Sequence, residues 1–560
     1  MRIKAKETGI YLWVGPEGLL ALGQAGIGRI AKASTKTVLE PGETPNMPPT
    51  RTEIALWESR NGGILFPKGA MKSLPGDWEW EIEPGEEGEN VKLSLRPLTR
   101  FPVKLEPAQM EILEAVRDAG HGGMIEAAMG AGKSWLLLAI ALGHPLLRPC
   151  AISGKGEKDT RQLLEKIKEL NAAYPEYAEP VMLSGLGRSL SKKDLKTLGE
   201  GEGIVVCTHA GLQNLPPNTK LLLLDEAHAA ATTKRIKAVL ALKDLKKLYT
   251  LTGTAGLRGD GGDEALGTLS GGTLASKGHE DFETTGRVAP AQINAYNFWG
   301  KGIYAENPYM PDQTPQEGYS LHATWVENHR GRHQFVADLV AWLPDDEIKV
   351  IFVPHILHAI RLCKAIEKKI KELYGDLTPQ QRANLKPEIF HAKADKNDRF
   401  YMPKEVREAK VAALVRGEIK LAVATDFLST GFDTNVIDHV IDASGQKAII
   451  TNIQRSGRGS RPKMRPDGTP KITQIHTILD KTHPVMHKLG EKRLSALCAY
   501  YGHFEGVENP ERLGGCRRFV EPPWIEPDER IKVRSTNPEE TFHAKAAPVF
   551  DPSAYRPKSA

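Results

Sequence analysis

The sequence of 560 residues predicts an α/β fold in which parallel sheets make up most of the chain and a smaller β-rich region comes first. Two observations predict the sheets. Between residues 101 and 285, short apolar runs that suit buried strands alternate with longer stretches that suit helices, and this alternation returns in the second half of the chain. A third observation predicts the β-rich region, because short β-prone runs alternate with Gly/Pro-rich turns throughout residues 1–100.

The first 100 residues are expected to form a small, mainly antiparallel β domain with one short helix near residues 69–74. Four tryptophans fall in this region: Trp13, Trp57, Trp78 and Trp80. Core positions are expected for them, because tryptophans in small β domains usually fill the interior. The domain is either a structural cap on the rest of the chain or an arm that binds nucleic acid, and the sequence leaves both open.

The chain is too long for a single core, so it is expected to divide into several domains. The changes in pattern predict a β-rich domain at 1–100, a first parallel-sheet domain at 101–287, a second at 288–479 and a C-terminal extension at 480–560. A helix is expected within residues 483–505. The Gly-rich stretch at 256–281 is expected to be a mobile loop or a lid that faces nucleic acid.

The composition excludes several classes of protein. The net charge of +5 is mildly basic, which permits a polyanionic partner without proving one. The five cysteines are scattered with no CxxC pair, so neither a zinc site nor a disulfide framework is indicated, and a reducing intracellular setting is expected. No apolar run is long enough for a signal peptide or a membrane span, which predicts a soluble cytoplasmic protein.

One motif predicts a phosphate-binding loop. Residues 127–134 read AAMGAGKS and lie between an apolar stretch and the apolar run WLLLAIAL, which is typical of a strand, a Gly-rich turn and a helix start. Backbone N–H groups of such a loop bind phosphate oxygens, while Lys133 reaches the β- and γ-phosphates and Ser134 holds Mg²⁺. Ala127 stands where the general GxxxxGK[ST] pattern has its first Gly. The expected nucleotide-binding residues of the loop are Gly130, Ala131, Gly132, Lys133 and Ser134.

A second motif predicts hydrolysis of the bound nucleotide. Residues 221–228 read LLLLDEAH, an apolar strand that ends in two carboxylates. Asp225 is the expected partner of Mg²⁺, and Glu226 is the expected residue that positions or activates the attacking water. Together the two motifs predict an enzyme that uses ATP and Mg²⁺.

The loop form AxxGxGK[ST], combined with DEAH, resembles superfamily 2 helicases and translocases. Five further strings fit the ordered motifs of that family: LEPAQ at 105–109, GIVVCTHAGLQNL at 203–215, LYTLTGTAGLRGD at 248–260, LAVATDFLSTGFD at 421–433 and QRSGRGSR at 454–461. Each string is weak alone, but their order and spacing agree with the family over about residues 100–480. The resemblance implies two tandem RecA-like domains, of which only the first holds a phosphate loop.

The resemblance also implies roles for single residues outside the two motifs. Gln109 is expected to read the adenine edge, whereas Gly431 and Asp433 are expected to contact the nucleotide and its ribose. Thr208 and Thr425 are expected to face a nucleic-acid backbone.

Three further residues are implied to couple hydrolysis to nucleic acid. These are His228, which closes the DEAH string, and Thr252 and Thr254, which form a Thr-Gly-Thr sequence in place of the more familiar Ser-Ala-Thr. Gln454 is implied to orient the attacking water or the γ-phosphate.

Arg455, Arg458 and Arg461 recur every three residues, which predicts that they lie along one side of a helix. The simpler interpretation is a solvated basic face. Because the first half of the chain holds the phosphate loop, the resemblance implies that Arg458 and Arg461 act as arginine fingers on the transferring phosphoryl group. Closure of the two domains would then complete the site and tie hydrolysis to motion.

With the strings GILFPKGAMKSL at 63–74 and GFDTNVIDHVIDASG at 431–445, the motif order resembles phage-encoded DNA helicases of the branch-migration type. The expected function is an ATP-dependent DNA helicase or double-strand translocase that remodels branched DNA in recombination, repair or replication. It would act in the cytoplasm of a host cell, on DNA and without a membrane partner. The sequence does not fix the oligomeric state, although a monomer fits.

Two alternatives to this function stay open. An RNA helicase would also contact a phosphate backbone, and only recognition of the 2′-hydroxyl separates the two polymers. A nucleotide-gated clamp would bind nucleic acid without productive turnover. The intact residues Lys133, Asp225, Glu226, Arg458 and Arg461 argue against a clamp.

Overall fold

The computed structural model describes residues 2–40, 49–85, 91–95, 98, 101, 103–175, 178–184, 190–254, 261–299, 325–373, 375–393, 398–428, 435–445, 449–465, 468–481, 484–502 and 518–519. These residues form two compact units, which divide between Phe282 and Glu283. The predicted fold class is confirmed, since each unit contains a seven-stranded sheet in which all neighbouring strands are parallel, and a β-rich region precedes the first. No helix in the described part of the chain is long and apolar enough to cross a membrane.

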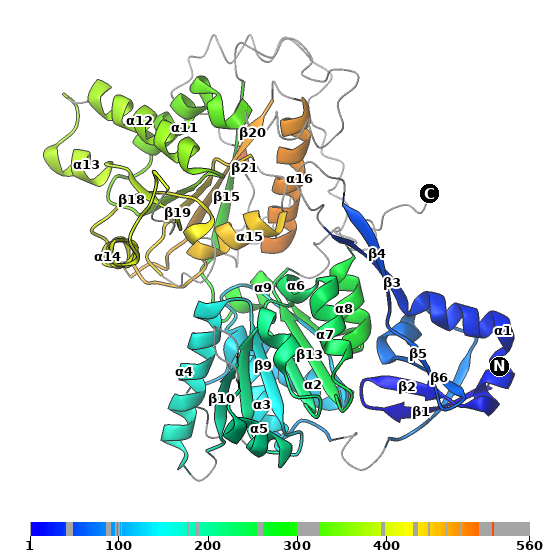
Figure 1. Ribbon diagram of the computed structural model, residues 1–560. Coiled ribbons are helices and arrows are strands. Elements are labelled where there is room, and N and C mark those ends of the chain that lie inside the picture. The colour runs from blue at the N-terminus through cyan, green and yellow to red at the C-terminus, as the bar shows by residue number, and fades with distance from the viewer. Residues whose placement is uncertain are drawn as a thin grey trace. The chain divides into compact units, whose positions relative to one another are not determined.

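The N-terminal region contains a five-stranded sheet of order β5-β6-β2-β1-β7 (Figure 1). Its strands are β1 (Arg2–Thr8), β2 (Tyr11–Val14), β5 (Glu58–Arg60), β6 (Gly63–Pro67) and β7 (Glu79–Glu83). A separate pair consists of β3 (Thr35–Glu40) and β4 (Thr50–Ala55), and the short helix expected near residue 70 is the 3₁₀ helix η1 (Lys68–Ser73). Trp78 is part of the buried core, and the partly buried Trp57 and Trp80 pack against it, whereas Trp13 is partly buried and is not part of this cluster.

Helix α1 (Pro16–Ala33) is the element of this region that the sequence pattern did not predict. Its buried residues recur every fourth position, at Gly18, Leu22, Gly26 and Ile30, so two glycines occupy the apolar stripe and weaken the helical signal. Gly18 is required there because a Cβ at this position would lie only 2.6 Å from the carbonyl oxygen of Lys4 on β1. Close packing on the sheet therefore explains a composition that reads as a loop.

The sheet of the first unit has the order β10-β11-β9-β12-β13-β8-β14. Its strands are β8 (Gly123–Ala127), β9 (Cys150–Gly154), β10 (Val181–Ser184), β11 (Ile204–Thr208), β12 (Leu221–Leu224), β13 (Lys247–Thr252) and β14 (Thr273–Lys277). Every residue of β12 is fully buried, as expected for a strand of a parallel sheet covered on both faces. Ligands of such sheets bind at the carboxyl ends of the strands, and the predicted motifs lie there.

Along the chain, the helices of the first unit precede, separate and follow these strands. They are α2 (Pro107–Ala119), α3 (Lys133–Gly143), α4 (Glu157–Ala173), α5 (Lys192–Gly199), η4 (His209–Asn214), α6 (Ala227–Ala230), α7 (Thr233–Leu240), α8 (Gly262–Ser270) and α9 (His279–Glu283).

The expectation of a loop at 256–281 is wrong for the residues that the structure describes, whereas residues 255–260 lie outside them. Helix α8 and strand β14 occupy most of this stretch, and β14 extends the sheet beside β8. The glycines of this stretch predicted a loop, but Gly262 is needed for close packing, because a Cβ at this position would overlap the carbonyl oxygen of Ala231. Ala265, Leu266 and Leu269 are buried and supply the apolar face of the helix.

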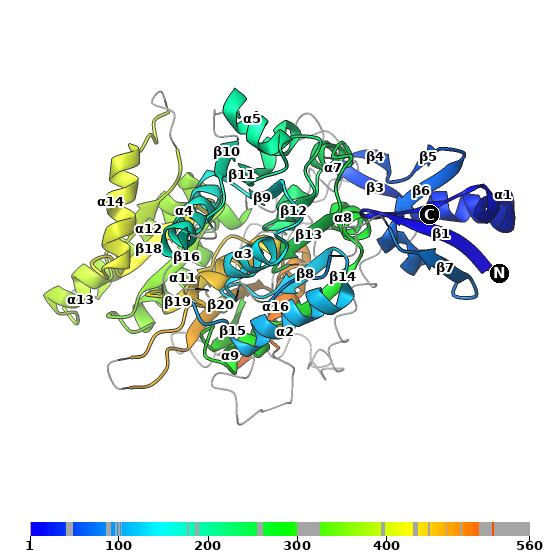
Figure 2. The ribbon, with the colours of Figure 1, turned by 90° about the horizontal axis from the view of Figure 1, so that it is seen from below.

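The N-terminal region shares a hydrophobic core with the first parallel sheet. Ile10, Val38 and Leu56 belong to the same buried cluster as Leu245 and Leu266. Strand β3 lies beside α8 in both views (Figure 2), and the ammonium of Lys36 lies 2.9 Å from a carboxylate oxygen of Glu264. The region is therefore packed on the first sheet through buried surface.

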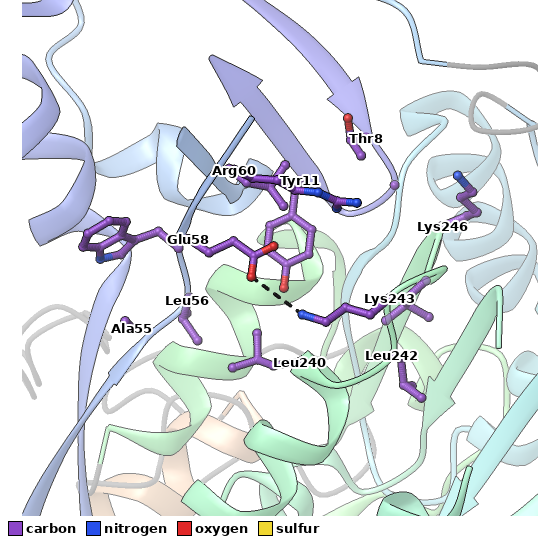
Figure 3. Close-up of a pocket in the computed structure, with 14 residues that line it drawn as sticks. Thr8, Tyr11, Ala55, Leu56, Glu58, Arg60, Leu240, Leu242, Lys243 and Lys246 are labelled. Atoms are coloured by element: carbon purple, nitrogen blue, oxygen red, sulfur yellow. Dashed lines mark ion pairs between the residues drawn. The ribbon is translucent and has the colours of Figure 1, made fainter. Parts of the chain in front are cut away.

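A cavity of about 120 Å³ opens at this contact. Figure 3 shows Tyr11 and Glu58 from the N-terminal strands directed toward Lys243, which precedes β13, and Glu58 and Lys243 form an ion pair of 3.6 Å. Apolar side chains of Leu56, Leu240 and Leu242 also line the cavity. Burial, reinforced by the charge of Glu58, raises the pKa of Tyr11 well above its usual range.

The second unit has a sheet of order β17-β18-β16-β19-β20-β15-β21. Its strands are β15 (Ala291–Phe298), β16 (Lys349–Phe352), β17 (Glu388–Phe390), β18 (Leu421–Ala424), β19 (His439–Asp442), β20 (Thr473–Asp480) and β21 (Arg518–Phe519). Its helices are α11 (Arg330–Trp342), α12 (Ile356–Glu372), α13 (Pro379–Asn384), α14 (Lys404–Val415), η5 (Asp426–Leu428), α15 (Ile449–Ser456), η6 (Gly457–Gly459) and α16 (Pro484–Tyr501). Helix α16 is the helix expected within residues 483–505.

Candidate nucleotide and nucleic-acid site

The phosphate-loop sequence forms the turn that its composition predicts. Strand β8 ends at Ala127 and helix α3 begins at Lys133. Gly130 and Gly132 have φ values of 84° and 80°, in the left-handed region that favours glycine. Ser134 follows in the first turn of α3 and is partly buried. The chain is thus turned so that the start of a helix meets the carboxyl edge of the sheet, where a phosphate gains most from the helix dipole.

Lys133 is buried and its ammonium is held by the loop itself. Its Nζ lies 3.4 Å from the carbonyl oxygens of Ala127 and Ala128, and 3.6 Å from Oε1 of Glu226. A Cβ at Gly253 would lie 3.2 Å from the same Nζ, so glycine gives the ammonium more room here than alanine would.

Asp225 directly follows β12 and lies deep in the site. Its backbone N–H donates to the carbonyl of Ser153 at 2.9 Å, and its Oδ1 accepts a hydrogen bond of 3.0 Å from the backbone N–H of Glu226. Burial and the neighbouring charge of Glu226 raise the pKa of Asp225 to about 7, although Lys133 opposes the shift. A bound divalent cation would favour the ionised carboxylate, so the donor set of Asp225 and the Ser134 hydroxyl fits Mg²⁺.

Glu226 adopts a backbone conformation that is rare for its residue type. Its φ of 46° and ψ of 51° are left-handed, a region in which non-glycine residues are uncommon and often functional. The conformation directs its carboxylate between two cations or potential cations. Oε1 lies 3.6 Å from Lys133, and Oε2 lies 3.4 Å from Nδ1 of His228.

His228 joins this pair to the Thr-Gly-Thr sequence that follows β13. Its Nδ1 lies 3.3 Å from Oγ1 of Thr252 and 3.4 Å from Oγ1 of Thr254. The backbone N–H of Thr254 also donates to Oγ1 of Thr252 at 3.2 Å. The structure therefore brings Lys133, Glu226, His228 and both threonines into one buried polar network.

Gln109 reaches the phosphate loop from helix α2. Its Nε2 donates to the carbonyl of Ala131 at 2.7 Å, and its Oε1 accepts the backbone N–H of Glu106 at 2.8 Å. The side chain is buried and closes the start of α2 as part of a capping box. An amide nitrogen has two N–H donors, so one remains after the bond to Ala131 for a ligand such as adenine.

The predicted nucleic-acid residues are divided between the units. Thr208 is the last residue of β11 and is buried, whereas Thr425 directly follows β18 and is partly buried. The backbone N–H of Thr425 donates to the carbonyl of Phe390 at 3.0 Å. Gly431 and Asp433 lie outside the described residues.

The prediction that three arginines share one side of a helix is wrong. Helix α15 ends at Ser456, directly after Arg455, and a 3₁₀ turn follows. Arg455 is fully buried, with its NH1 3.3 Å from Oδ1 of Asp442 and 2.8 Å from Oγ of Ser444. The spacing of three residues could not show this, because it does not reveal where the α-helix ends, and Arg458 and Arg461 both follow that end.

Arg458 and Arg461 differ from Arg455 in being only partly buried. The Nε of Arg458 donates to the backbone carbonyl of Gln454 at 3.2 Å, and Gln454 itself is buried at the end of α15. The second unit thus holds one arginine as part of its interior and leaves two that reach its surface.

Ser153 and His209 form a buried pair beside the site that was not predicted from the sequence. Oγ of Ser153, on β9, lies 2.8 Å from Nδ1 of His209 in η4. His209 directly follows Thr208, so a polar residue after a buried strand was a usable signal.

Residues 336–463 match the model of the helicase conserved C-terminal domain. The match runs from α11 to the residues after the arginine-rich motif, all of which lie in the second unit. This part of the chain therefore resembles the C-terminal domain of helicases. No curated protein sequence matches the chain.

Several solved structures are similar to the chain at low sequence identity. T4 UvsW is 17% identical, with 93% of this chain and 99% of that chain covered and a TM-score of 0.37. Dbp5 of S. cerevisiae, solved with RNA and ADP BeF3, is 15% identical, with 74% and 90% covered and a TM-score of 0.44. The helicase Lhr of Mycobacterium smegmatis, solved with single-stranded DNA and AMP-PNP, is 16% identical, with 70% and 48% covered and a TM-score of 0.41.

Proposed function

We propose that this protein is an ATP-driven DNA helicase or double-strand translocase that remodels branched DNA. The observation that carries the proposal is the buried network of Lys133, Glu226, His228, Thr252 and Thr254 at the carboxyl edge of the first sheet. A phosphate-binding lysine is there connected to a candidate catalytic carboxylate and, through it, to residues that follow a neighbouring strand. Such an arrangement allows nucleotide binding to change the surroundings of the group that activates water.

Binding of ATP would begin with an exchange of partners at Lys133. The β- and γ-phosphates would replace the carbonyl oxygens of Ala127 and Ala128, and the backbone N–H groups of the glycine turn would bind the same phosphates. Ser134 and Asp225 would hold Mg²⁺, which neutralises charge on the phosphates. Gln109 would offer its free N–H to the adenine edge.

Hydrolysis would then depend on Glu226. When Lys133 binds the phosphates, the carboxylate of Glu226 would lose its ammonium partner. The carboxylate could then orient the attacking water and accept a proton from it. His228 would hold the second carboxylate oxygen and transmit its position to Thr252 and Thr254.

The second unit is proposed to supply the remaining charges during the catalytic cycle. Arg458 and Arg461 would stabilise the transferring phosphoryl group, an effect that can be worth ~10³–10⁵ in rate. Gln454 would orient the water or the γ-phosphate, while Gly431 and Asp433 would contact nucleotide and ribose. The burial of Arg455 supports a structural role for this residue, because its bond to Asp442 holds the end of α15 in place. Arg458 follows that end and donates to the carbonyl of Gln454.

DNA is proposed as the polymer, with contacts from Thr208, Thr425 and cations of the N-terminal region. Among the lysines of that region, Lys4, Lys36 and Lys68 form ion pairs with Glu17, Glu264 and Glu7. Arg29, Lys32 and Lys72 are exposed, and none forms an ion pair within the part of the chain that the structure describes. These three are the better candidates for phosphate contacts.

The deciding experiment compares ATP hydrolysis and strand separation over single-stranded, duplex, forked and four-way DNA, with matched single-stranded and duplex RNA. The proposal expects the largest stimulation of kcat by forked or four-way DNA, and no stimulation in the Lys133→Ala control. Stronger stimulation by RNA would instead favour an RNA helicase. Nucleic-acid binding without hydrolysis by any substrate would favour the clamp.

A further inference from the structure

The Ser153–His209 pair lies between the candidate nucleic-acid residue and the candidate catalytic residue. Strand β9 is flanked by β11 on one side and β12 on the other. Ser153 is paired in register with Cys207 and with Leu224, so the next residues on these two strands, Thr208 and Asp225, lie on opposite sides of β9. A side chain that follows Thr208 and turns across β9 must therefore approach Asp225 and Glu226.

His209 is that side chain. Its ring is buried, and Nδ1 takes part in the hydrogen bond of 2.8 Å with Ser153. Burial, aided by Arg235, lowers the pKa of His209 to about 4, while backbone groups of Glu226 and Asp225 act in the opposite direction. The ring is thus neutral at physiological pH and lies against the backbone of the DEAH sequence.

One nitrogen of this ring is not satisfied. Among the residues that the structure describes, no group meets Nε2 of His209 with the geometry of a hydrogen bond, although the atom is shielded from water and the backbone of Asp225 and Glu226 lies close enough to affect the pKa of the ring. A neutral imidazole has one N–H and one acceptor nitrogen, so when the Ser153 hydroxyl donates to Nδ1 the proton is on Nε2. An unpaired buried donor is costly and is a common feature of groups that find their partner in another state.

We propose that His209 is a positioning residue that transmits nucleic-acid binding at Thr208 to Glu226, an inference that rests on the proposed function. In the described conformation, the Glu226 carboxylate is engaged by Lys133 and His228. A nucleic-acid backbone bound at Thr208 shifts the start of η4, and Nε2–H of His209 then donates to a backbone carbonyl of Asp225 or Glu226. Since Glu226 has a left-handed backbone, a small movement of this peptide redirects its carboxylate toward water.

Two substitutions separate the two nitrogens of the ring. His209→Asn keeps a polar group near Ser153 and removes the reach of Nε2, whereas His209→Gln extends an amide N–H toward the Nε2 position. The measured quantity is the ratio of kcat with saturating forked DNA to kcat without it. His209→Asn is expected to lower this ratio about tenfold, within the usual range of coupling between sites. His209→Gln is expected to retain most of the ratio, and KM for ATP is expected to change little in either variant.

His144 provides a matched control. It is also a buried histidine whose pKa burial lowers, to about 3, and its Nε2 lies 3.1 Å from the hydroxyl of Tyr249. It follows the C-terminal end of α3, away from the phosphate loop. His144→Asn is expected to lower Tm by a similar amount while leaving the ratio unchanged. Ser153→Ala gives an independent variant, because loss of the hydroxyl frees the ring and is expected to lower the ratio as well.

The outcomes separate this inference from the proposed function. If the wild-type protein hydrolyses ATP and is stimulated by forked DNA, but His209→Asn and Ser153→Ala are stimulated equally well, the inference is overturned and the proposed function stands. An equal fall of the ratio in His144→Asn and His209→Asn would also overturn it, because both effects would then be structural. Absence of ATP hydrolysis in the wild-type protein would overturn the proposed function and the inference together.

Discussion

Lys133 and Glu226 form an ion pair in which the ammonium lies 3.6 Å from a carboxylate oxygen. Each charge partly neutralises the other at a place where Lys133 is buried and Glu226 is partly buried. This arrangement explains how a carboxylate is tolerated beside the glycine-rich turn. Substitutions should separate the two proposed roles, because only Lys133 is proposed to bind the nucleotide.

Glu226→Gln tests the proposed role of Glu226 in hydrolysis. The variant is expected to bind ATP and DNA, because the loop and Lys133 remain, but to lose kcat by about 10²–10⁴-fold, the usual contribution of a general base. Equilibrium binding of an ATP analogue and single-turnover hydrolysis measure the two properties separately. Turnover equal to that of the wild-type protein would contradict the role of Glu226.

Asp225 makes the stability of the metal-free protein depend on pH. Its pKa is raised to about 7 in the folded protein, against about 3.9 in an unfolded chain, so the folded state binds a proton that the unfolded state has released. The contribution of this group to stability is therefore fully present below the unfolded value, and it is lost as pH rises through 7. Asp225→Asn should flatten this part of the pH dependence of Tm in the absence of Mg²⁺.

The same sign predicts how Mg²⁺ acts on the wild-type protein. The metal requires the ionised carboxylate, so its stabilising effect is expected to grow as pH rises through neutrality. A pH profile of Tm that is identical in the wild-type protein and Asp225→Asn, with and without Mg²⁺, would show that Asp225 is not the titrating ligand.

At the scale of elements, the arginine-rich motif depends on the point at which α15 ends. Arg455 is the last arginine in the α-helix and is buried against Asp442, and Arg493 lies 3.9 Å from the other oxygen of that carboxylate. Although burial opposes the shift, Arg455 and Arg493 hold the pKa of Asp442 below its usual value. The 3₁₀ turn that follows contains Arg458, whose Nε donates to the backbone carbonyl of Gln454.

Three alanine substitutions test this division. Arg455→Ala is expected to lower the free energy of unfolding by about 3 kcal/mol, because it leaves a buried carboxylate with one partner fewer. Arg458→Ala and Arg461→Ala are expected to preserve Tm and ATP binding and to lower kcat by orders of magnitude. If either surface variant lost only DNA affinity, the motif would be a phosphate-backbone contact and the arginine-finger role would fail.

Much of this architecture could be predicted from the sequence, because buried parallel strands are short and strongly apolar and their motifs follow them directly. The phosphate loop and the DEAH strand are examples. Helix α16 was also predicted from the sequence. Helices α1 and α8 could not, since glycines that permit close packing resemble loop residues in a pattern search. The side-chain network of Glu226, His228, Thr252 and Thr254 was foreseen only as separate residues, because their contacts depend on how β12 and β13 lie side by side.

For the molecule as a whole, the N-terminal region is an integral part of the first unit. It shares a buried core with the sheet through residues such as Ile10, Leu56 and Leu245. Removal of residues 1–100 would expose that core, so a truncated chain is a poor test of whether the region binds DNA. Single exposed cations offer a better test.

The combined variant Arg29→Ala, Lys32→Ala and Lys72→Ala measures the role of the region in DNA binding. If each residue neutralises one phosphate, the slope of log K against log salt is expected to become shallower by roughly 0.9 for each lost contact on duplex DNA. Lys4→Ala is the matched control, because Lys4 is already paired with Glu17 at 3.4 Å and should change the slope less. A slope equal to that of the wild-type protein in the combined variant would show that the region is a structural cap.

We propose that the Lys133–Glu226 network hydrolyses ATP in response to DNA. The steady-state rate of ATP hydrolysis by the wild-type protein and by Lys133→Ala, measured as forked DNA is added in the presence of Mg²⁺, tests this proposal. The rate is expected to rise with DNA to saturation in the wild-type protein and to stay at background in Lys133→Ala. A wild-type rate that does not respond to DNA, or a Lys133→Ala rate that rises like the wild type, would contradict it.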